Sequence, residues 1–238
     1  MIRVHELRVD AGVVVFDKDG TLLQIDPLWT DLVRDWLTGI IRRVDRPDLL
    51  GELRSAIAVA DDGRLVPNGI AHAGTMDEAV EAVAATLYRH GVGDAESHVL
   101  AAGADIGEPD PADIVPVGDV AGTMTRLKNA GVALVVATSD ERRSTEAHLE
   151  LLGVNELVNL VVCADDDLAS KPSPEVLGRV GDGLGVAAER IVMVGDSEVD
   201  MLTGRNGGAA ACIGVTGGGG DPVGADVCVE TIEQICLG

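Results

Sequence analysis

Five short apolar runs recur along the chain, and each of them ends in polar residues. The runs cover 12–16, 132–137, 157–163, 191–194 and 209–215. Continuous β-branched and aliphatic runs of this length predict strands that are buried on both faces of a sheet. Because a polar segment or a glycine run comes after each one, we expect the ends of these strands to carry the chemistry.

Segments with helical periodicity lie between these strands. They cover 119–130, 142–152, 173–184 and 198–206, and each is closed by a Gly or Asn, which suits a helix C-terminus. Alternating strands and helices with short connections predict an α/β fold with a doubly wound, Rossmann-like parallel sheet. Ligands of such sheets bind at the carboxyl ends of the strands, where the polar residues lie.

One long stretch interrupts the alternation of strands and helices. It shows no convincing strand, and its helical patterns cover 27–44, 47–60, 77–90 and 94–102. We therefore expect two domains, an α/β core formed by residues 1–24 and 114–238 and an all-helical domain inserted at 25–113.

The charge balance is strongly acidic, with 40 Asp and Glu residues against 18 Lys and Arg and a formal net charge of −22. A hydrophobic fraction of 46% can enclose a core, which excludes a disordered chain. An acidic surface repels phosphate backbones and anionic lipid, so nucleic-acid and membrane partners are disfavoured. No run approaches the roughly 18 apolar residues of a membrane span, and we expect a cytoplasmic protein whose oligomeric state the sequence leaves open.

Two carboxylates, Asp17 and Asp19, come directly after the first predicted strand. Since side chains alternate along a strand, both project toward the same side of the carboxyl edge of the sheet. Their mutual repulsion raises the pKa of one of them unless a cation neutralises the pair. A divalent metal or a protonated general acid is the functional interpretation, and an ordinary turn is the competing one.

Two further acids, Asp196 and Asp200, come after the fourth predicted strand. They are four residues apart, which places them on the same face of a helix that begins there. Capping of that helix would explain Asp196 but does not require Asp200. Together with Asp17 and Asp19 they supply up to four carboxylates, the oxygen ligands that Mg²⁺ takes when a substrate phosphate completes its shell.

Groups suited to binding a phosphate come after the remaining strands. Thr138 and Ser139 end the second strand, and Lys171, one of three lysines in the chain, lies between the third and fourth. Each by itself is also typical of a turn or of a solvated helix start. The glycine run 217–220 lacks the Lys-Ser or Lys-Thr of a phosphate-binding P-loop, so we interpret it as a plain flexible turn.

The order of these motifs resembles that of the haloacid dehalogenase superfamily of aspartate-nucleophile phosphotransferases. The resemblance rests on Asp17-x-Asp19-Gly20-Thr21, then Thr138, then Lys171, then Asp196 with Asp200. It implies that Asp17 attacks phosphorus to form a phosphoaspartate. It also implies that Asp19 protonates the leaving alcohol and then activates water.

The resemblance further implies a set of binding residues. The phosphoryl group would be bound by Thr138, Ser139 and Lys171, next to Gly20 and Thr21. Mg²⁺ would be bound by the Asp17 carboxylate, the Asp19 backbone carbonyl and Asp196, with Asp200 behind them. Lys18 is unusual for the nearest relatives, where an apolar residue is common at this place. A second phosphate contact and a side chain that points away are both open for it.

The helical insert resembles the α-helical cap of the phosphoglycolate phosphatases and their close relatives. The resemblance therefore implies a Mg²⁺-dependent phosphatase whose substrate is a small phosphomonoester similar to phosphoglycolate. An acid at Asp19 supports phosphate chemistry, because the dehalogenases of the superfamily generally lack it. The alternatives are a phosphosugar mutase of the same superfamily, a non-catalytic phosphate-binding protein, and a signalling receiver, which would be about half this length and have no insert.

Overall fold

The computed structural model describes residues 1–106 and 111–238. The chain divides into two compact units, an α/β unit formed by Met1–Gln24 with Ile114–Gly238, and a helical unit formed by Ile25–Asp113. Each unit encloses a hydrophobic core of its own side chains. The polar motifs predicted to carry the chemistry all lie in the α/β unit.

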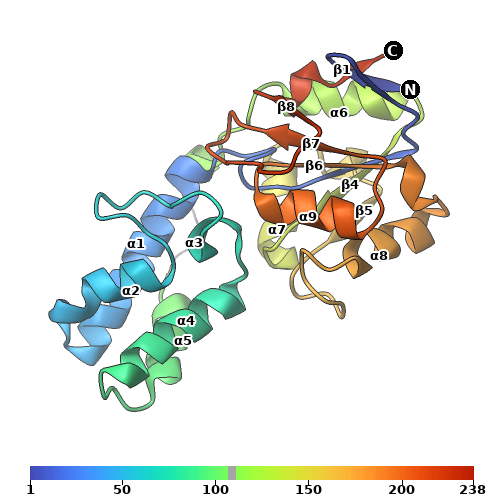
Figure 1. Ribbon diagram of the computed structural model, residues 1–238. Coiled ribbons are helices and arrows are strands. Elements are labelled where there is room, and N and C mark those ends of the chain that lie inside the picture. Colours follow the sequence, from blue (N-terminus) through green and yellow to red (C-terminus); the bar gives the residue numbers. More distant parts are fainter. Residues whose placement is uncertain (107–110) are drawn as a thin grey trace. The chain divides into compact units, whose positions relative to one another are not determined.

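Among the described residues, six parallel strands form one sheet in the order β5-β4-β3-β6-β7-β8 (Figure 1). The strands are β3 (Val13–Phe16), β4 (Ala133–Ala137), β5 (Leu160–Val162), β6 (Ile191–Gly195), β7 (Ala211–Val215) and β8 (Val227–Val229). The first five coincide with the five apolar runs, so the predicted doubly wound α/β fold is confirmed. The short edge strand β8 was not predicted.

Helices cover both faces of this sheet, and α6 and α9 lie on opposite faces (Figure 1). They are α6 (Val120–Asn129), α7 (Arg142–Leu151), α8 (Glu175–Leu184) and α9 (Glu198–Asn206). The central strand β3 supplies both faces, because its side chains alternate. Val14 and Phe16 pack in the cluster that contains residues of α6 and α7, whereas Val13 and Val15 pack in the cluster that contains residues of α8 and α9.

A small antiparallel sheet in the α/β unit joins the two ends of the chain. In the described structure its order is β2-β1-β9, with β1 (Ile2–Val4), β2 (Leu7–Val9) and β9 (Cys236–Leu237). The N- and C-termini therefore lie close together (Figure 1). The sequence pattern predicts no element in these segments, because neither contains a continuous apolar run like those of the large sheet.

The helical unit is built from α1 (Ile25–Val44), α2 (Leu50–Ala56), α3 (Ile70–Ala73), α4 (Met76–Arg89) and α5 (Ala95–Ala104). Helix α4 begins with a capping box in which Thr75 and Glu78 each bond the other's backbone N–H. Trp36 is buried in the core of this unit, and its indole N–H donates to the Val99 carbonyl at 3.2 Å. The four-residue α3 was not predicted.

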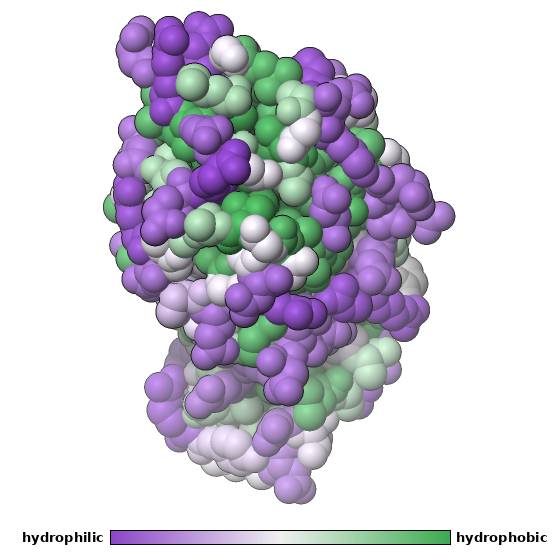
Figure 2. Space-filling model, turned by 90° about the vertical axis from the view of Figure 1, so that its right-hand side faces the viewer, coloured by the Kyte–Doolittle hydropathy of each residue, from purple (hydrophilic) through white to green (hydrophobic). Residues whose placement is uncertain are grey.

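Short 3-10 helices connect the longer elements. They are η1 (Pro47–Leu49), η2 (Pro111–Asp113), η3 (Asn155–Leu157), η4 (Ala188–Arg190) and η5 (Ile232–Gln234). No helix of the described chain is long and apolar enough to cross a bilayer. On the face shown in Figure 2, hydrophilic side chains cover much of the surface, with smaller hydrophobic areas between them. Such a mixed surface is ordinary for a folded domain.

Candidate functional site

The loops after β3, β4 and β6 meet at the carboxyl edge of the sheet. Strand β3 is central and pairs with β4 on one side and β6 on the other. Asp17 comes directly after β3, Thr138 after β4 and Asp196 after β6. The backbone N–H of Asp17 donates to the Val194 carbonyl at 2.8 Å, and that of Thr138 donates to the Val162 carbonyl at 2.9 Å. The sheet therefore fixes the backbone positions from which these side chains extend.

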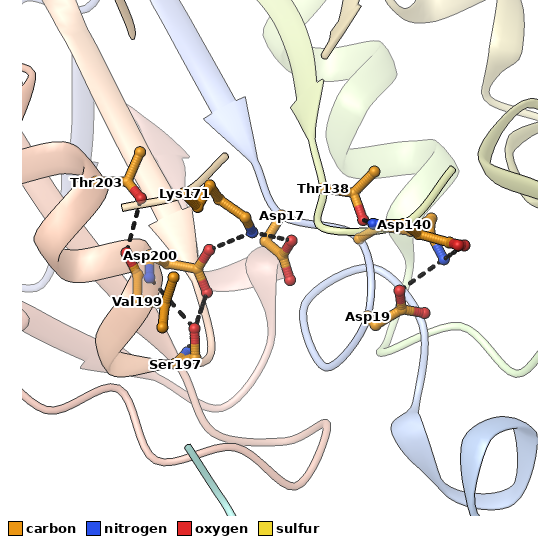
Figure 3. Close-up of polar contacts among 10 residues, drawn as sticks. Asp17, Asp19, Thr138, Asp140, Lys171, Ser197, Val199, Asp200 and Thr203 are labelled. Carbon is orange, nitrogen blue, oxygen red and sulfur yellow. Dashed lines mark hydrogen bonds and ion pairs between the residues drawn. The ribbon is translucent and has the colours of Figure 1, made fainter. Parts of the chain in front are cut away.

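Lys171 lies between Asp17 and Asp200 (Figure 3). Its Nζ is 2.6 Å from Oδ1 of Asp17 and 2.7 Å from Oδ1 of Asp200, and its side chain is 5% exposed. Burial by itself lowers the pKa of a lysine, but the two carboxylates outweigh it and raise the pKa of Lys171. The side chain is therefore a buried ammonium at the edge of the sheet.

The first turn of α9 holds Asp200 in place. Ser197 is the N-cap residue: its Oγ accepts from the backbone N–H of Asp200 at 3.3 Å and donates to Oδ2 of Asp200 at 2.6 Å. The backbone N–H of Ser197 donates to the same carboxylate oxygen at 3.1 Å. Oδ1 of Asp200 thereby faces Lys171. Because Ser197 is the N-cap, the alternative that Asp196 serves only as a helix cap is wrong.

Among the described residues, Asp17, Asp196 and Asp200 form a buried group in which one carboxylate oxygen of each lies within 4.8 Å of those of the other two. Burial and then the charge of Asp200 raise the pKa of Asp17 to about 7, although Lys171 acts in the opposite direction. Burial and the charge of Asp17 raise the pKa of Asp196 well above its usual range. Three crowded carboxylates around one ammonium favour an added cation, and their oxygens are the donors that Mg²⁺ prefers. The donor set fits a divalent metal.

The carboxylate of Asp19 does not belong to that group. It is directed toward Asp140 (Figure 3), and its Oδ2 lies 2.6 Å from Nζ of Lys18. Lys18 is fully buried and also contacts Oδ2 of Asp140 at 3.2 Å and Nδ1 of His148 at 3.1 Å. Burial lowers the pKa of Lys18, but Asp19 and Asp140 outweigh it and raise that pKa. Of the two roles left open for Lys18, the structure does not favour the second phosphate contact, because its Nζ is already bound by Asp19, Asp140 and His148.

The residues expected to bind phosphate lie around this edge with different degrees of exposure. Thr138 is buried, and its Oγ1 accepts from the backbone N–H of Asp140 at 3.1 Å, while Ser139 beside it is half-buried. Gly20 has φ of +78°, and a Cβ at this position would lie 2.1 Å from Oδ2 of Asp196. Thr21 is fully buried. Its role as a substrate contact stays a prediction.

The glycine run 217–220 packs directly against the site. A Cβ on Gly218 would lie 2.1 Å from the carbonyl oxygen of Gly20, and one on Gly220 would lie 2.2 Å from Oδ2 of Asp196. With contacts this short, a side chain at either position would have to displace its neighbours. The run is a turn, as predicted, but it is packed against the site and is therefore not a plain flexible one. Its position after a buried strand, at the edge where the other motifs gather, was the signal in the sequence.

Two residues of the Lys18 contacts, Asp140 and His148, were not singled out in the sequence. Asp140 lies two residues after Thr138, and His148 is on α7, 130 residues from Lys18 along the chain. A lysine between two acids in a buried loop indicates that partners exist, because a buried charge requires them. Nothing in the sequence shows which residues the fold brings to it.

Within the helical unit, helices α1 and α5 border a cavity of about 880 Å³. Its lining includes three of the insert's arginines, Arg34, Arg42 and Arg43. Arg34 forms an ion pair with Asp31, and Arg43 forms one with Asp105. Charges of both signs therefore line this cavity.

The chain is similar to known hydrolases in sequence. A model of the haloacid dehalogenase-like hydrolases matches residues 12–208. A phosphoglycolate phosphatase of Caulobacter vibrioides is 29% identical over 238 residues, which covers 99% of this chain and 92% of that protein. Pyrophosphatase PpaX of Halalkalibacterium halodurans is 32% identical over 100 residues, 42% of this chain and 46% of that protein. A phosphoglycolate phosphatase of Cupriavidus necator is 32% identical over 116 residues, and the chain spans about half the length of these last two relatives.

Solved structures share the fold across nearly the whole chain. A HAD phosphatase from Thermococcus onnurineus superposes with a TM-score of 0.65 and 20% identity, covering 93% of this chain and 94% of the other. A hydrolase from Pseudomonas syringae gives a TM-score of 0.62 with 17% identity, covering 94% and 95%. At these identities the comparison establishes the architecture, and the chemistry depends on the residues at the edge of the sheet.

Proposed function

Since the chain belongs to the haloacid dehalogenase-like hydrolases, the family expected from its motifs, we propose that it is a Mg²⁺-dependent phosphatase that uses Asp17 as its nucleophile. The observation that carries this proposal is the buried Lys171 ammonium, which contacts Asp17 and Asp200 at the carboxyl edge of the sheet. A carboxylate nucleophile beside a fixed cation is suited to attack an anionic phosphoryl group.

In the proposed first step, a carboxylate oxygen of Asp17 forms a bond to phosphorus while the bond from phosphorus to the leaving oxygen breaks. Lys171 is placed to bind a phosphoryl oxygen, because its Nζ already lies 2.6 Å from the attacking carboxylate. Thr138 offers a hydroxyl group at the end of the neighbouring strand. The carboxyl group of Asp19 gives its proton to the leaving alkoxide. The products are a phosphoaspartate and a neutral alcohol.

In the proposed second step, water attacks the phosphorus of the phosphoaspartate. Asp19, now ionised, accepts a proton from that water as the new bond forms, and the Asp17 carboxylate leaves. Inorganic phosphate is released, and both aspartates return to their starting state. Two displacements at phosphorus, each assisted by one positioned carboxyl group, replace a single direct attack by water.

The proposed Mg²⁺ would be held by Asp17 and Asp196, together with the Asp19 backbone carbonyl, and Asp200 would support them from α9. When bound, the cation would neutralise the crowded carboxylates and the negative charge on the transferring group. The fit rests on one carboxylate oxygen from each of the three acids, because these oxygens lie within 4.8 Å of one another. Asp200 reaches this group from the first turn of α9, where Ser197 fixes it.

The proposed substrate is a small phosphomonoester similar to phosphoglycolate, used in the cytoplasm. Support comes from the match to the phosphoglycolate phosphatase of Caulobacter vibrioides, which extends over 99% of this chain. Inorganic pyrophosphate is the second candidate, because pyrophosphatase PpaX is 32% identical over the region it shares with this chain. A phosphosugar mutase would use the same phosphoaspartate but return the phosphate to a sugar.

A panel of phosphorylated compounds tests the proposal. Phosphoglycolate, other alkyl phosphates, sugar phosphates, p-nitrophenyl phosphate and pyrophosphate are each incubated with the protein in Mg²⁺ or in EDTA, and released phosphate is measured. We expect hydrolysis of a small alkyl phosphate that needs Mg²⁺ and is lost in EDTA. Isomerised sugar phosphate without phosphate release would indicate the mutase. Full activity in chelator would contradict the proposed metal.

A further inference from the structure

A cluster of polar side chains around the buried Lys18 lies next to the site and takes part in the two proposed steps through one residue only. It consists of Lys18, Asp19, Asp140 and His148, and we name it the Lys18 cluster. The side chain of Lys18 is 0% exposed, and its Nζ lies 2.6 Å from Oδ2 of Asp19, 3.2 Å from Oδ2 of Asp140 and 3.1 Å from Nδ1 of His148. Of these four residues, Asp19 alone has a role in the proposed reaction, so any effect of the cluster on the reaction passes through Asp19.

The hydrogen atoms of the Lys18 ammonium fix the orientation of the cluster. A lysine ammonium has three hydrogens to donate and accepts none, and Asp19, Asp140 and His148 present three acceptors to it. Since Nδ1 of His148 accepts, its imidazole carries its hydrogen on Nε2 and is neutral. Three acceptors in different directions leave the ammonium little freedom to rotate away from Asp19.

The acceptors are themselves held by the start of α7. Oδ2 of Asp140 also accepts from Oγ of Ser144 at 2.8 Å, and Oδ1 of Asp140 accepts from the backbone N–H of Glu141 at 2.8 Å. His148 lies one helical turn after Ser144 on the same face of α7. Lys18 therefore connects the carboxylate of Asp19 to a rigid helix.

The same contacts connect Asp19 to the phosphate-binding turn. The backbone N–H of Asp140 donates to Oγ1 of Thr138 at 3.1 Å, so Asp140 joins Lys18 to the residue expected to hold a phosphoryl oxygen. Burial of an ammonium is costly even when it is paired, and an apolar side chain would fill the same space without that cost. Stability is thus a weak reason for a lysine here, whereas a fixed donor at this place orients the Asp19 carboxylate.

We propose that Lys18 is a positioning residue that sets the direction of the Asp19 carboxyl group, the group that exchanges protons with the leaving alcohol and with water. The proposal rests on the proposed function, in which Asp19 is the acid and base. Lys18 holds Oδ2 of Asp19 at 2.6 Å, which restricts the directions that the remaining oxygen, Oδ1, can take. Loss of the Lys18 Nζ would leave the Asp19 carboxyl group in the protein but would no longer fix its orientation.

The test compares leaving groups in Lys18→Met, which keeps the length of the side chain and removes the ammonium. An alkyl phosphate needs a proton on its leaving oxygen, whereas p-nitrophenol leaves readily as an anion. We expect kcat/KM for the best alkyl phosphate of the panel to fall about 10- to 100-fold. For p-nitrophenyl phosphate we expect it to fall less than about 3-fold. The parameter kcat/KM is chosen because it reports formation of the phosphoaspartate for both substrates.

Two further variants separate positioning from a structural role. In an Asp19→Asn background, Lys18→Met is expected to change kcat/KM for the alkyl phosphate less than about 2-fold, because the group that Lys18 acts through is gone. Asp140→Asn keeps the shape of the side chain and weakens the hold on Nζ, so it is expected to show a smaller loss with the same preference for the alkyl substrate. Asp140→Asn also tests the positioning role if Lys18→Met does not fold.

The matched control is Lys128→Met. Lys128 is another lysine of the α/β unit, and its Nζ donates to the backbone carbonyls of Glu156 and Leu157 at 2.6 and 3.0 Å. Lys128→Met is expected to leave unchanged the ratio of kcat/KM for the alkyl phosphate to kcat/KM for p-nitrophenyl phosphate. An equal loss for both substrates in folded Lys18→Met, or no loss, would overturn the positioning role. Absence of wild-type turnover across the panel would instead overturn the proposed function, and the inference with it.

Discussion

At the scale of single residues, Asp17 combines two opposed requirements. A nucleophilic carboxylate must be ionised, yet burial and the nearby Asp200 raise the pKa of Asp17 to about 7 in the metal-free protein. Lys171 compensates for part of this effect. The remaining excess of negative charge is what a divalent cation would neutralise, so catalysis and metal binding depend on the same carboxylate.

The raised pKa of Asp17 predicts how the stability of the metal-free protein depends on pH. The folded-state pKa of Asp17 lies above the ordinary value of 3.8, so between about pH 4 and pH 7 the folded state binds more protons than the unfolded state, and this group makes stability fall as pH rises. Asp17→Asn removes the contribution. At pH 8 in EDTA we expect the variant to be more stable than wild type by on the order of 2 to 4 kcal/mol, with little difference at pH 4.

Urea unfolding at a series of pH values, in EDTA and in Mg²⁺, measures this difference. Mg²⁺ should stabilise wild type increasingly as pH rises through 7 and should have much less effect on Asp17→Asn. The exposed Asp167 lies in the loop that precedes Lys171, and Asp167→Asn is the control for removing one acid nearby. A stability difference between Asp17→Asn and wild type that is constant from pH 4 to pH 8 would show that Asp17 titrates normally.

Residue by residue, the sequence could place the side chains at the ends of strands but not the contacts that the fold assembles from distant segments. Asp17, Thr138 and Asp196 could be placed because each comes directly after a buried run. The contacts of Lys18 could not, since His148 is 130 residues away on the face of a helix. A sequence shows that a buried lysine needs acceptors, but only the packing of α7 against the loop after β3 identifies them.

At the scale of elements, the strength of the periodic signal decided which strands could be predicted. Strands β3, β4, β6 and β7 have four or five residues with every position buried or nearly so, and all were predicted. The strands of the small sheet have two or three residues. Their stability comes from pairing between the two ends of the chain, which no local pattern records.

The glycine loop 217–220 gives a prediction at this scale. A methyl group on Gly218 would lie 2.1 Å from the Gly20 carbonyl, so Gly218→Ala must displace the loop that carries Asp19 and Gly20. We expect kcat/KM to fall at least about 10-fold for every substrate, because a shift of about 1 Å at a catalytic group is enough for such a loss. Circular dichroism and steady-state kinetics on the purified variant measure both folding and activity.

The control for that variant is Gly178→Ala on the exposed side of α8, where an added Cβ meets nothing within 4 Å. This substitution should leave activity unchanged and stabilise the protein by about 0.5 to 1 kcal/mol, because alanine loses less backbone entropy in a helix. Wild-type kinetics in Gly218→Ala would mean that the loop yields easily and does not hold the site.

At the scale of the whole molecule, the formal net charge of −22 is the dominant electrostatic property. Repulsion among these charges opposes the compact state, and salt screens it. The Debye length falls from about 10 Å at 0.1 M to about 3 Å at 1 M ionic strength. We therefore expect Tm in EDTA to rise by several degrees with NaCl and to level off by about 0.5 M. A Tm that is constant or falls over this range would contradict net repulsion.

The central claim, that Asp17 is the nucleophile of a Mg²⁺-dependent phosphatase, is tested most directly by phosphate release from wild type, Asp17→Asn and Asp167→Asn, each in Mg²⁺ and in EDTA. All three proteins are first shown to be folded by circular dichroism, and the substrate is the best alkyl phosphate of the panel. We expect turnover by wild type and Asp167→Asn in Mg²⁺ alone, and a loss of at least about 10⁴-fold in Asp17→Asn. Turnover near the wild-type rate in Asp17→Asn, or in EDTA, would contradict the claim.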